Sequence, residues 1–169
     1  MDLEAVFEFV APRVREAAKK AAAQLAYLGV RYALVGGLAV GAHGYLRATK
    51  DVDFLVGDEA FEHHGLLVTF KPGIPIEVDG IKIDYLSPQA LGPQLERAFD
   101  SPNRSAGMNV IEIEPLIFMK LVARRRQDLL DVVELVKSGA NPAPIRHYLK
   151  FVAPELLSQF ELLVEEASG

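Results

Sequence analysis

Apolar and polar positions follow a helical period at the start of the chain and an alternating period in its middle. Residues 3–28 carry apolar side chains at about every third or fourth position, which predicts one amphipathic helix that ends at Gly29. The alternating runs predict strands, and Asp79-Gly80 between two such runs is a strong turn signal. The predicted strands are 31–37, 51–57, 66–72 and 109–114, together with a hairpin over 75–86.

Further helices are predicted around these strands. Ser87-Pro88 is a typical helix start, Gly139 closes a helical pattern, and Pro154 divides the last one. The predicted helices are 38–46, 87–99, 114–139 as one helix or two adjoining ones, and two short helices within 141–167. Strands in the middle of the chain with helices on both sides predict an α/β or α+β fold, with a mixed sheet of about four to six strands.

The length of 169 residues predicts a single domain. Within it we expect an N-terminal helix over 1–29, a sheet-bearing core over 30–115 and a C-terminal helical part over 116–169. Half of the residues are hydrophobic, which is enough to form a sizeable core.

Charge and composition exclude several classes of protein. The formal net charge of −5 argues against non-specific nucleic-acid binding by the whole surface. The absence of cysteine excludes disulfides and thiolate metal sites. The N-terminus lacks a signal-peptide pattern, and no apolar run reaches the length of about 18 residues that a membrane span needs. We therefore expect a cytoplasmic protein that does not contact a membrane.

Two acidic residues lie one position apart on a predicted strand. Asp51 and Asp53 would share one face, with backbones about 6.5–7 Å apart, which is close enough to converge on a divalent cation. Asp84, the acid of the next strand run, could add a third carboxylate and complete a metal site. Glu77 and Asp79 lie nearby, although Asp79 suits the turn better. The alternative is that the acids cover a solvated strand face.

A pair of glycines ends the strand that precedes these acids. Gly36-Gly37 would let backbone amides approach a ligand closely, and a helix that begins there would favour an anion. On its own, a glycine pair is equally typical of an ordinary tight turn. Its position upstream of Asp51 and Asp53 makes the combination more specific.

The stretch LVGGLAVGAHGYLRATKDVDFLV resembles the signature of the DNA polymerase beta-like nucleotidyltransferase superfamily. That signature is a strand, Gly-Gly or Gly-Ser, a spacer and Asp-x-Asp on the next strand. Here thirteen residues separate Gly37 from Asp51, and Arg47-x-Thr49-x-Asp51-x-Asp53 is similar to the form found in small prokaryotic, AbiEii-like members. The chain carries Gly-Gly where better-studied members often have Gly-Ser, and so lacks a hydroxyl that can contact phosphate.

The resemblance implies a nucleotidyltransferase fold and a reaction that uses a nucleoside triphosphate. The triphosphate would lie over Gly36 and Gly37, with Mg²⁺ or Mn²⁺ held by Asp51, Asp53 and Asp84. Asp84 would match the family's third carboxylate, which helps to deprotonate an acceptor hydroxyl. Pyrophosphate would be the leaving group.

The resemblance continues in the segment FMKLVARRRQDLLDVVEL. It implies that Lys120 contacts the triphosphate, and that Arg47, Thr49 and Asp128 belong to the nucleotide site. If one helix spans this segment, then Lys120, Arg124, Asp128 and Asp131 share one face. The alternative for Arg124 and Asp128 is a surface ion pair that contributes about 0.3–0.5 kcal/mol. The basic run 124–126 could contact RNA or could be a solvated face.

Three functional hypotheses remain open from the sequence. The first is transfer of a nucleoside monophosphate to a hydroxyl on an RNA end, a protein or a small molecule. The second is a catalytically silent module that binds a nucleotide or a partner. The third is a role in a toxin–antitoxin or defence pair, with a cognate antitoxin as partner, and this one rests on the resemblance alone. An oligomer is possible through the apolar first helix.

Overall fold

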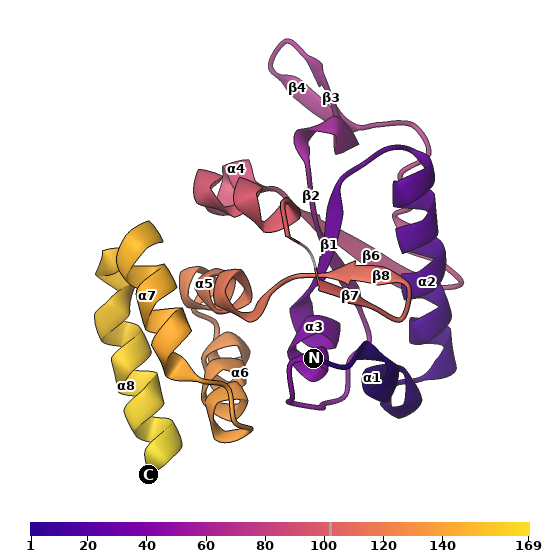
Figure 1. Ribbon diagram of the computed structural model, residues 1–169. Coiled ribbons are helices and arrows are strands. Elements are labelled where there is room, and N and C mark those ends of the chain that lie inside the picture. The colour runs from indigo at the N-terminus through magenta and orange to yellow at the C-terminus, as the bar shows by residue number, and fades with distance from the viewer. Residues whose placement is uncertain (102) are drawn as a thin grey trace.

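The computed structural model describes residues 1–101 and 103–169, and its centre is a six-stranded mixed sheet (Figure 1). The strands of the sheet lie in the order β5-β6-β2-β1-β8-β7. Parallel pairs join β6 to β2 and β1 to β8, and the other neighbours are antiparallel. The strand bounds are β1 Tyr32–Val35, β2 Val52–Val56, β3 Phe61–His64, β4 Leu67–Phe70, β5 Glu77–Val78, β6 Ile81–Leu86, β7 Asn103–Ser105 and β8 Met108–Val110.

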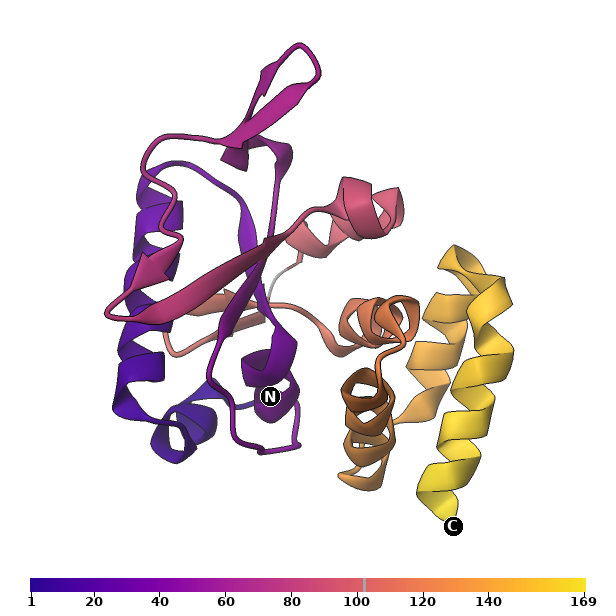
Figure 2. The same cartoon turned by 180° about the vertical axis from the view of Figure 1, so that it is seen from behind.

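Helices lie on both sides of this sheet, which confirms the predicted mixed α/β class. Helix α2 packs along one side, whereas α5 to α8 gather on the other side (Figures 1 and 2). The helix bounds are α1 Leu3–Phe9, α2 Pro12–Tyr27, α3 Gly36–Ala42, α4 Pro88–Leu91, α5 Ile113–Ala123, α6 Arg126–Lys137, α7 Pro142–Val152 and α8 Leu157–Ser168, with short 3₁₀ helices at Asp58–Ala60, Pro93–Phe99 and Pro154–Leu156.

The predicted single helix over residues 3–28 is wrong. The chain forms α1 and α2, separated by Val10 and Ala11, neither of which has helical ψ. Pro12 is the reason, because proline disfavours helical geometry in the residue before it and cannot donate a helical hydrogen bond. Pro12 is instead the first residue of α2, a position where its missing N–H costs nothing.

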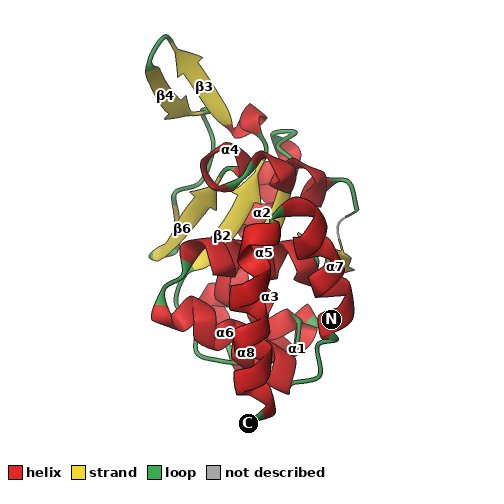
Figure 3. Ribbon diagram, turned by 90° about the vertical axis from the view of Figure 1, so that its left-hand side faces the viewer, coloured by secondary structure: helices red, strands yellow, loops and turns green. Residues whose placement is uncertain are grey.

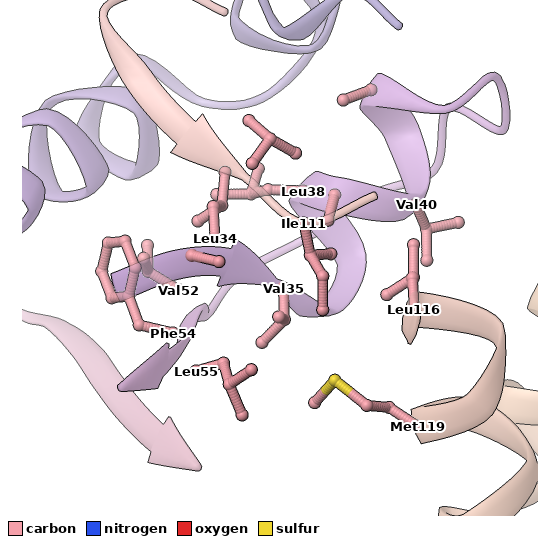
Figure 4. Close-up of a cluster of buried hydrophobic side chains, with 14 of the residues drawn as sticks. Leu34, Val35, Leu38, Val40, Val52, Phe54, Leu55, Ile111, Leu116 and Met119 are labelled. Atoms are coloured by element: carbon pink, nitrogen blue, oxygen red, sulfur yellow. The ribbon is translucent and has the colours of Figure 1, made fainter. Parts of the chain in front are cut away.

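Strand β2 lies in the middle of the sheet and forms the base of the hydrophobic core. Val52, Phe54 and Leu55 are fully buried and pack with residues of β1, α3 and α5 (Figure 4). The Phe54 ring also lies against Tyr32 and Tyr85, with ring centroids 5.6 and 6.2 Å apart. Because both faces of the strand are packed, β2 holds its polar residues in a fixed place.

Strands β3 and β4 form a separate hairpin that projects away from the main sheet (Figure 3). The predicted strand 66–72 exists as β4, but it pairs only with β3 and does not join the main sheet. Leu66 at the tip is fully exposed, and Leu67, Val68 and Phe70 are exposed as well. The sequence alternation identified a strand but could not show that it lies outside the core.

Three other boundaries differ from the predictions. The strand expected over 109–114 ends at Val110, and α5 begins at Ile113 with a proline in its first turn. The helix expected over 87–99 is interrupted at Gly92-Pro93, where α4 ends and a 3₁₀ helix begins. The helix expected over 38–46 begins earlier, at Gly36, and ends at Ala42.

The hairpin over 75–86 and the two terminal helices agree with the sequence patterns. Asp79-Gly80 forms the turn between β5 and β6, and both residues have positive φ angles. Asp79 also pairs with Lys20 of α2 at 2.7 Å, which fixes the turn against that helix. Pro154 separates α7 from α8.

Arg31 joins three segments at one end of the sheet, and its replacement tests that connection. It pairs with Glu59 and Glu96, and its guanidinium lies 5.0 Å from the centre of the Phe99 ring. Because these groups are partly exposed, we expect Arg31→Ala to lower the free energy of unfolding by about 1 kcal/mol. Urea unfolding measures this change. Arg15→Ala is the matched control, since Arg15 pairs only with its neighbour Glu16; equal effects of the two substitutions would contradict the expectation.

Candidate active site

Two of the predicted acidic residues stand side by side on neighbouring strands. Strands β2 and β6 are parallel, and their register places Asp53 directly beside Asp84. Asp51 immediately precedes β2 and is exposed, whereas Asp53 and Asp84 are partly buried. The hairpin turn at Asp79-Gly80 sets the start of β6 and therefore helps to fix this register. Glu77, the other nearby acid, lies on β5 opposite Lys82.

The environment of Asp53 disfavours its negative charge. Burial is the main cause, and the carboxylates of Asp84 and Asp51 add to it, so that the pKa of Asp53 rises from 3.8 to about 6. Lys120 and Arg125 act in the opposite direction without cancelling the rise. Because the neighbouring acids raise the pKa of Asp53, the group would attract a cation.

The two glycines allow the chain to turn tightly beside Asp53. Gly36 has a φ of +69°, and a Cβ atom there would lie 2.1 Å from Oδ2 of Asp53. A Cβ atom on Gly37 would lie 2.7 Å from Oγ1 of Thr49 and 3.1 Å from a guanidinium nitrogen of Arg47. Both positions therefore need glycine for a steric reason, and the close approach keeps the backbone of α3 next to the acids.

The loop before β2 brings a cation and a hydroxyl to the same place. Arg47 donates two hydrogen bonds to Asp131 of α6, from Nε and Nη2, both at 2.9 Å. The Thr49 hydroxyl donates to the backbone carbonyl of Arg47 at 3.3 Å. Together these contacts hold the loop in a defined shape beside Gly37.

Lys120 lies in a buried group of charges. Its Nζ is 3.2 Å from Asp128 and 2.9 Å from Asp131, and its side chain is only 8% exposed. Arg125 contacts Asp128 at 2.7 Å through Nε. Burial tends to raise the pKa of Asp128, but Arg125 and Lys120 outweigh this effect and the pKa is lowered. Together with Arg47, which pairs with Asp131, these groups carry three positive and two negative charges.

The expectation that Lys120, Arg124, Asp128 and Asp131 share one face of one helix is wrong. The helix ends at Ala123, Arg124 adopts a left-handed conformation with a φ of +57°, and a second helix begins at Arg126. Asp128 therefore pairs with Arg125 and Lys120 and not with Arg124. Asp128 also accepts a hydrogen bond from the backbone N–H of Arg125, which caps α6.

Apart from Arg124 and Asp131, these groups line one cleft between the sheet and helices α5 and α6, with a volume of about 800 Å³. Every residue that the sequence assigned to the site lies on its wall. They are Gly36, Gly37, Arg47, Thr49, Asp51, Asp53, Asp84, Lys120 and Asp128. The fold thus brings together residues that are up to 92 positions apart in the sequence.

Sequence reasoning missed several other lining residues. Arg125 was considered only as part of the basic run 124–126, and Lys50 and Gln127 were not assigned to the site. The apolar part of the wall was missed entirely, because leucine and methionine at helical spacing read as ordinary core. It consists of Leu86, Leu91, Leu116, Met119 and Ala123, with Tyr85 beside them. A possible signal for Arg125 was the acid three positions later, which is typical of a helix start.

The carboxylates suit a hard divalent cation by their chemistry. Mg²⁺ and Mn²⁺ prefer oxygen ligands, and Mg²⁺ is usually held by one or two carboxylates together with substrate phosphates. Within residues 1–101 and 103–169, no three histidine, cysteine or acidic side chains are arranged to hold a metal ion by themselves. Asp51, Asp53 and Asp84 therefore do not form a three-carboxylate metal site by themselves, and a cation bound here would need further oxygen ligands, such as those of a phosphate.

The fold of this chain is similar to that of a solved structure. It is the crystal structure of an antigenic nucleotidyltransferase-like protein from Paracoccidioides brasiliensis, with a TM-score of 0.52 and 15% sequence identity, covering 94% of this chain and 93% of that one. The chain has a nucleotidyltransferase-like fold. No protein-family model matches this sequence, and no curated protein resembles it in sequence at a significant level.

The cleft of this nucleotidyltransferase-like fold has two sides. The side on β2 and β6 is acidic, and the side on α5 and α6 carries charges of both signs. Gly36 and Gly37 lie between these sides, at the start of α3. In the described part of the chain, no helix has the length and apolarity needed to cross a membrane.

Proposed function

We propose that this protein is a magnesium-dependent nucleotidyltransferase that moves a nucleoside monophosphate from a nucleoside triphosphate to a hydroxyl group. The observation that carries the proposal is the pairing of Asp53 with Asp84 beside Gly36, in a cleft whose opposite wall is cationic. The nucleotidyltransferase-like fold supports the same class of enzyme.

Each side chain has a role in this reaction. Asp51, Asp53 and Asp84 would hold Mg²⁺ or Mn²⁺, which supplies charge stabilisation for the phosphoryl oxygens when bound. Asp84, whose side chain is 39% exposed, would accept the proton of the acceptor hydroxyl. The hydroxyl oxygen then forms a bond to the α-phosphorus, the bond from that phosphorus to the bridging oxygen breaks, and pyrophosphate leaves.

The remaining lining residues would bind and orient the triphosphate. Backbone N–H groups at Gly36 and Gly37 can approach phosphate oxygens because no side chain intervenes. Arg47 and Lys120 would supply positive charge, with the Thr49 hydroxyl and Asp128 completing the wall. The apolar part of the cleft, with Leu91, Leu116 and Met119, would accept the nucleobase.

We place the protein among the small prokaryotic, AbiEii-like nucleotidyltransferases on the basis of its Arg-x-Thr-x-Asp-x-Asp motif. With this assignment we propose a cytoplasmic protein that acts on an RNA end, a protein or a small molecule, and a cognate antitoxin as its partner. Toxicity on expression that a neighbouring gene product relieves would support the assignment. Harmless expression would count against it.

A second candidate is a nucleotide-binding module without turnover. Lys120 favours this candidate, because its ammonium group is already paired with Asp128 and Asp131 and its charge is neutralised by them. Calorimetry would then detect nucleotide affinity while no pyrophosphate is released.

The proposed reaction is tested by transfer of label from α-³²P nucleoside triphosphates with Mg²⁺ to a panel of RNA, protein and small-molecule acceptors. We expect the parent protein to transfer label and Asp53→Asn to lose about 10²- to 10³-fold of the rate, as for other groups that stabilise charge in a transition state. Asp58→Asn is the matched control, because Asp58 is an exposed acid just beyond β2 that pairs with His63. Equal transfer by the parent and Asp53→Asn would refute the assignment of the site.

A further inference from the structure

Asp131 holds three residues of the cleft wall without lying on that wall itself. Its side chain is completely buried, and it is absent from the residues that line the cleft. It contacts Arg47 from the loop before β2, Lys120 from α5 and Gln127 from α6. All three of these partners do line the cleft.

The carboxylate of Asp131 has no capacity left for a ligand. Its Oδ1 atom accepts from Nε of Arg47 at 2.9 Å and from Nε2 of Gln127 at 2.8 Å. Its Oδ2 atom accepts from Nη2 of Arg47 and lies 2.9 Å from Nζ of Lys120. A carboxylate offers about four lone-pair sites, and these four donors occupy them. Any effect of Asp131 on a bound molecule must pass through its partners.

The contact with Arg47 crosses between two parts of the molecule. Among the residues that the structure describes, it is the one ion pair that joins residues 1–112 to helices α5 to α8. The pair uses two guanidinium nitrogens, Nε and Nη2, which fixes the orientation of the Arg47 side chain as well as its distance. By contrast, Asp128 joins only α5 and α6 and lines the cleft itself.

We propose that Asp131 is a positioning residue that aims Arg47 and Lys120 at the phosphates of a bound triphosphate. The proposal rests on the proposed function, because it assigns the cationic wall to the triphosphate. The proposal predicts a change in triphosphate affinity opposite in direction to the change that charge alone would cause. Loss of the negative charge of Asp131 makes the wall more positive, so simple attraction would tighten triphosphate binding, whereas loss of positioning weakens it.

The test is the affinity of Asp131→Asn for inorganic tripolyphosphate with Mg²⁺, measured by isothermal titration calorimetry. We expect binding about 10- to 100-fold weaker than in the parent, the range found for groups that orient the ligands of a site. Glu134→Gln is the matched control, because it removes an equal charge one turn later on α6, where Glu134 faces only Lys137 at 3.7 Å. The control should bind as the parent does.

Arg47→Lys provides a second variant in case Asp131→Asn does not fold, as judged by circular dichroism. It keeps the positive charge but loses the two-pronged contact with Asp131, so we again expect weaker binding of tripolyphosphate. Where both single variants fold, the double variant should lose little more than either one, because the two substitutions break the same contact.

The outcomes separate this inference from the proposed function. Folded Asp131→Asn that binds tripolyphosphate as tightly as the parent, or more tightly, overturns the positioning role and leaves the proposed function standing. Where Asp131→Asn does not fold, parent-like binding by Arg47→Lys overturns the role in the same way. A parent that binds tripolyphosphate but transfers no nucleotide overturns the proposed function alone. A parent that does not bind tripolyphosphate overturns both.

Discussion

Asp53→Asn is expected to stabilise the protein in metal-free buffer at pH 7.5 while it abolishes nucleotide transfer. The pKa of Asp53 is raised to about 6 in the folded protein, first by burial and then by Asp84 and Asp51. The folded state therefore holds the proton more tightly than the unfolded chain does, and ionisation at neutral pH costs folding free energy. Asparagine carries no charge, so we expect the free energy of unfolding to rise by about 1–3 kcal/mol.

The same pKa fixes the pH dependence of this effect. Well below pH 3.8 the carboxyl group is protonated in both states and contributes nothing. Between pH 4 and 6 the unfolded chain loses its proton first, so the contribution of Asp53 to stability falls as pH rises and is at its lowest above pH 6. The gain from Asp53→Asn should accordingly be small at pH 4 and complete at pH 7.5.

Thermal unfolding of both proteins at the two pH values, in the presence of a chelator, measures the gain. Asp58→Asn serves as the control, because Asp58 is an exposed acid that lies outside the group. Mg²⁺ should raise the midpoint of the parent more than that of Asp53→Asn, since bound cation stabilises the folded state. An equal or lower midpoint for Asp53→Asn at pH 7.5 without metal would show that ionisation of Asp53 does not cost folding free energy.

Gly36→Ala is expected to lower the free energy of unfolding by about 2–4 kcal/mol and to disrupt the cleft. Part of the cost is the positive φ of +69°, which alanine adopts only with strain. The larger part is steric, because the new Cβ would lie 2.1 Å from Oδ2 of Asp53, and β2 is too tightly packed to move. Urea unfolding gives the stability, and tripolyphosphate binding should weaken in parallel.

Gly29→Ala separates the two costs of this substitution. Gly29 has a φ of +72°, almost the same as Gly36, but nothing lies within 4 Å of a Cβ atom placed there. It should therefore lose only about 1 kcal/mol, the conformational part. If both substitutions cost the same, the contact between Gly36 and Asp53 has no steric importance.

Local patterns were sufficient to predict the fold class. Alternation, the Asp79-Gly80 turn and the glycine pair each depend on neighbouring residues, and the mixed sheet flanked by helices is confirmed. The same patterns failed where a proline or glycine interrupted a regular helical spacing of apolar residues. Pro12 divided a regular helical pattern into α1 and α2. Gly92-Pro93 interrupted the pattern over residues 87–99.

The candidate site was only partly visible in the sequence because its contacts are long-range. The motif around Asp51 and Asp53 is local and could be recognised. Asp131 lies 84 positions from Arg47, and no spacing rule connects the two. Its importance follows only from the bend at Arg124, which turns α6 so that its first two acids face α5.

That bend also limits how the length of this chain can vary. One residue inserted between Arg124 and Arg126 would change the joint that sets α6 against α5, and with it the placement of Asp128 and Asp131 beside Lys120. The tip of the β3–β4 hairpin at Gly65-Leu66 lies outside the core, where added residues displace nothing. Relatives and engineered versions of this protein should therefore differ in length at the hairpin tip and keep the joint before α6 unchanged.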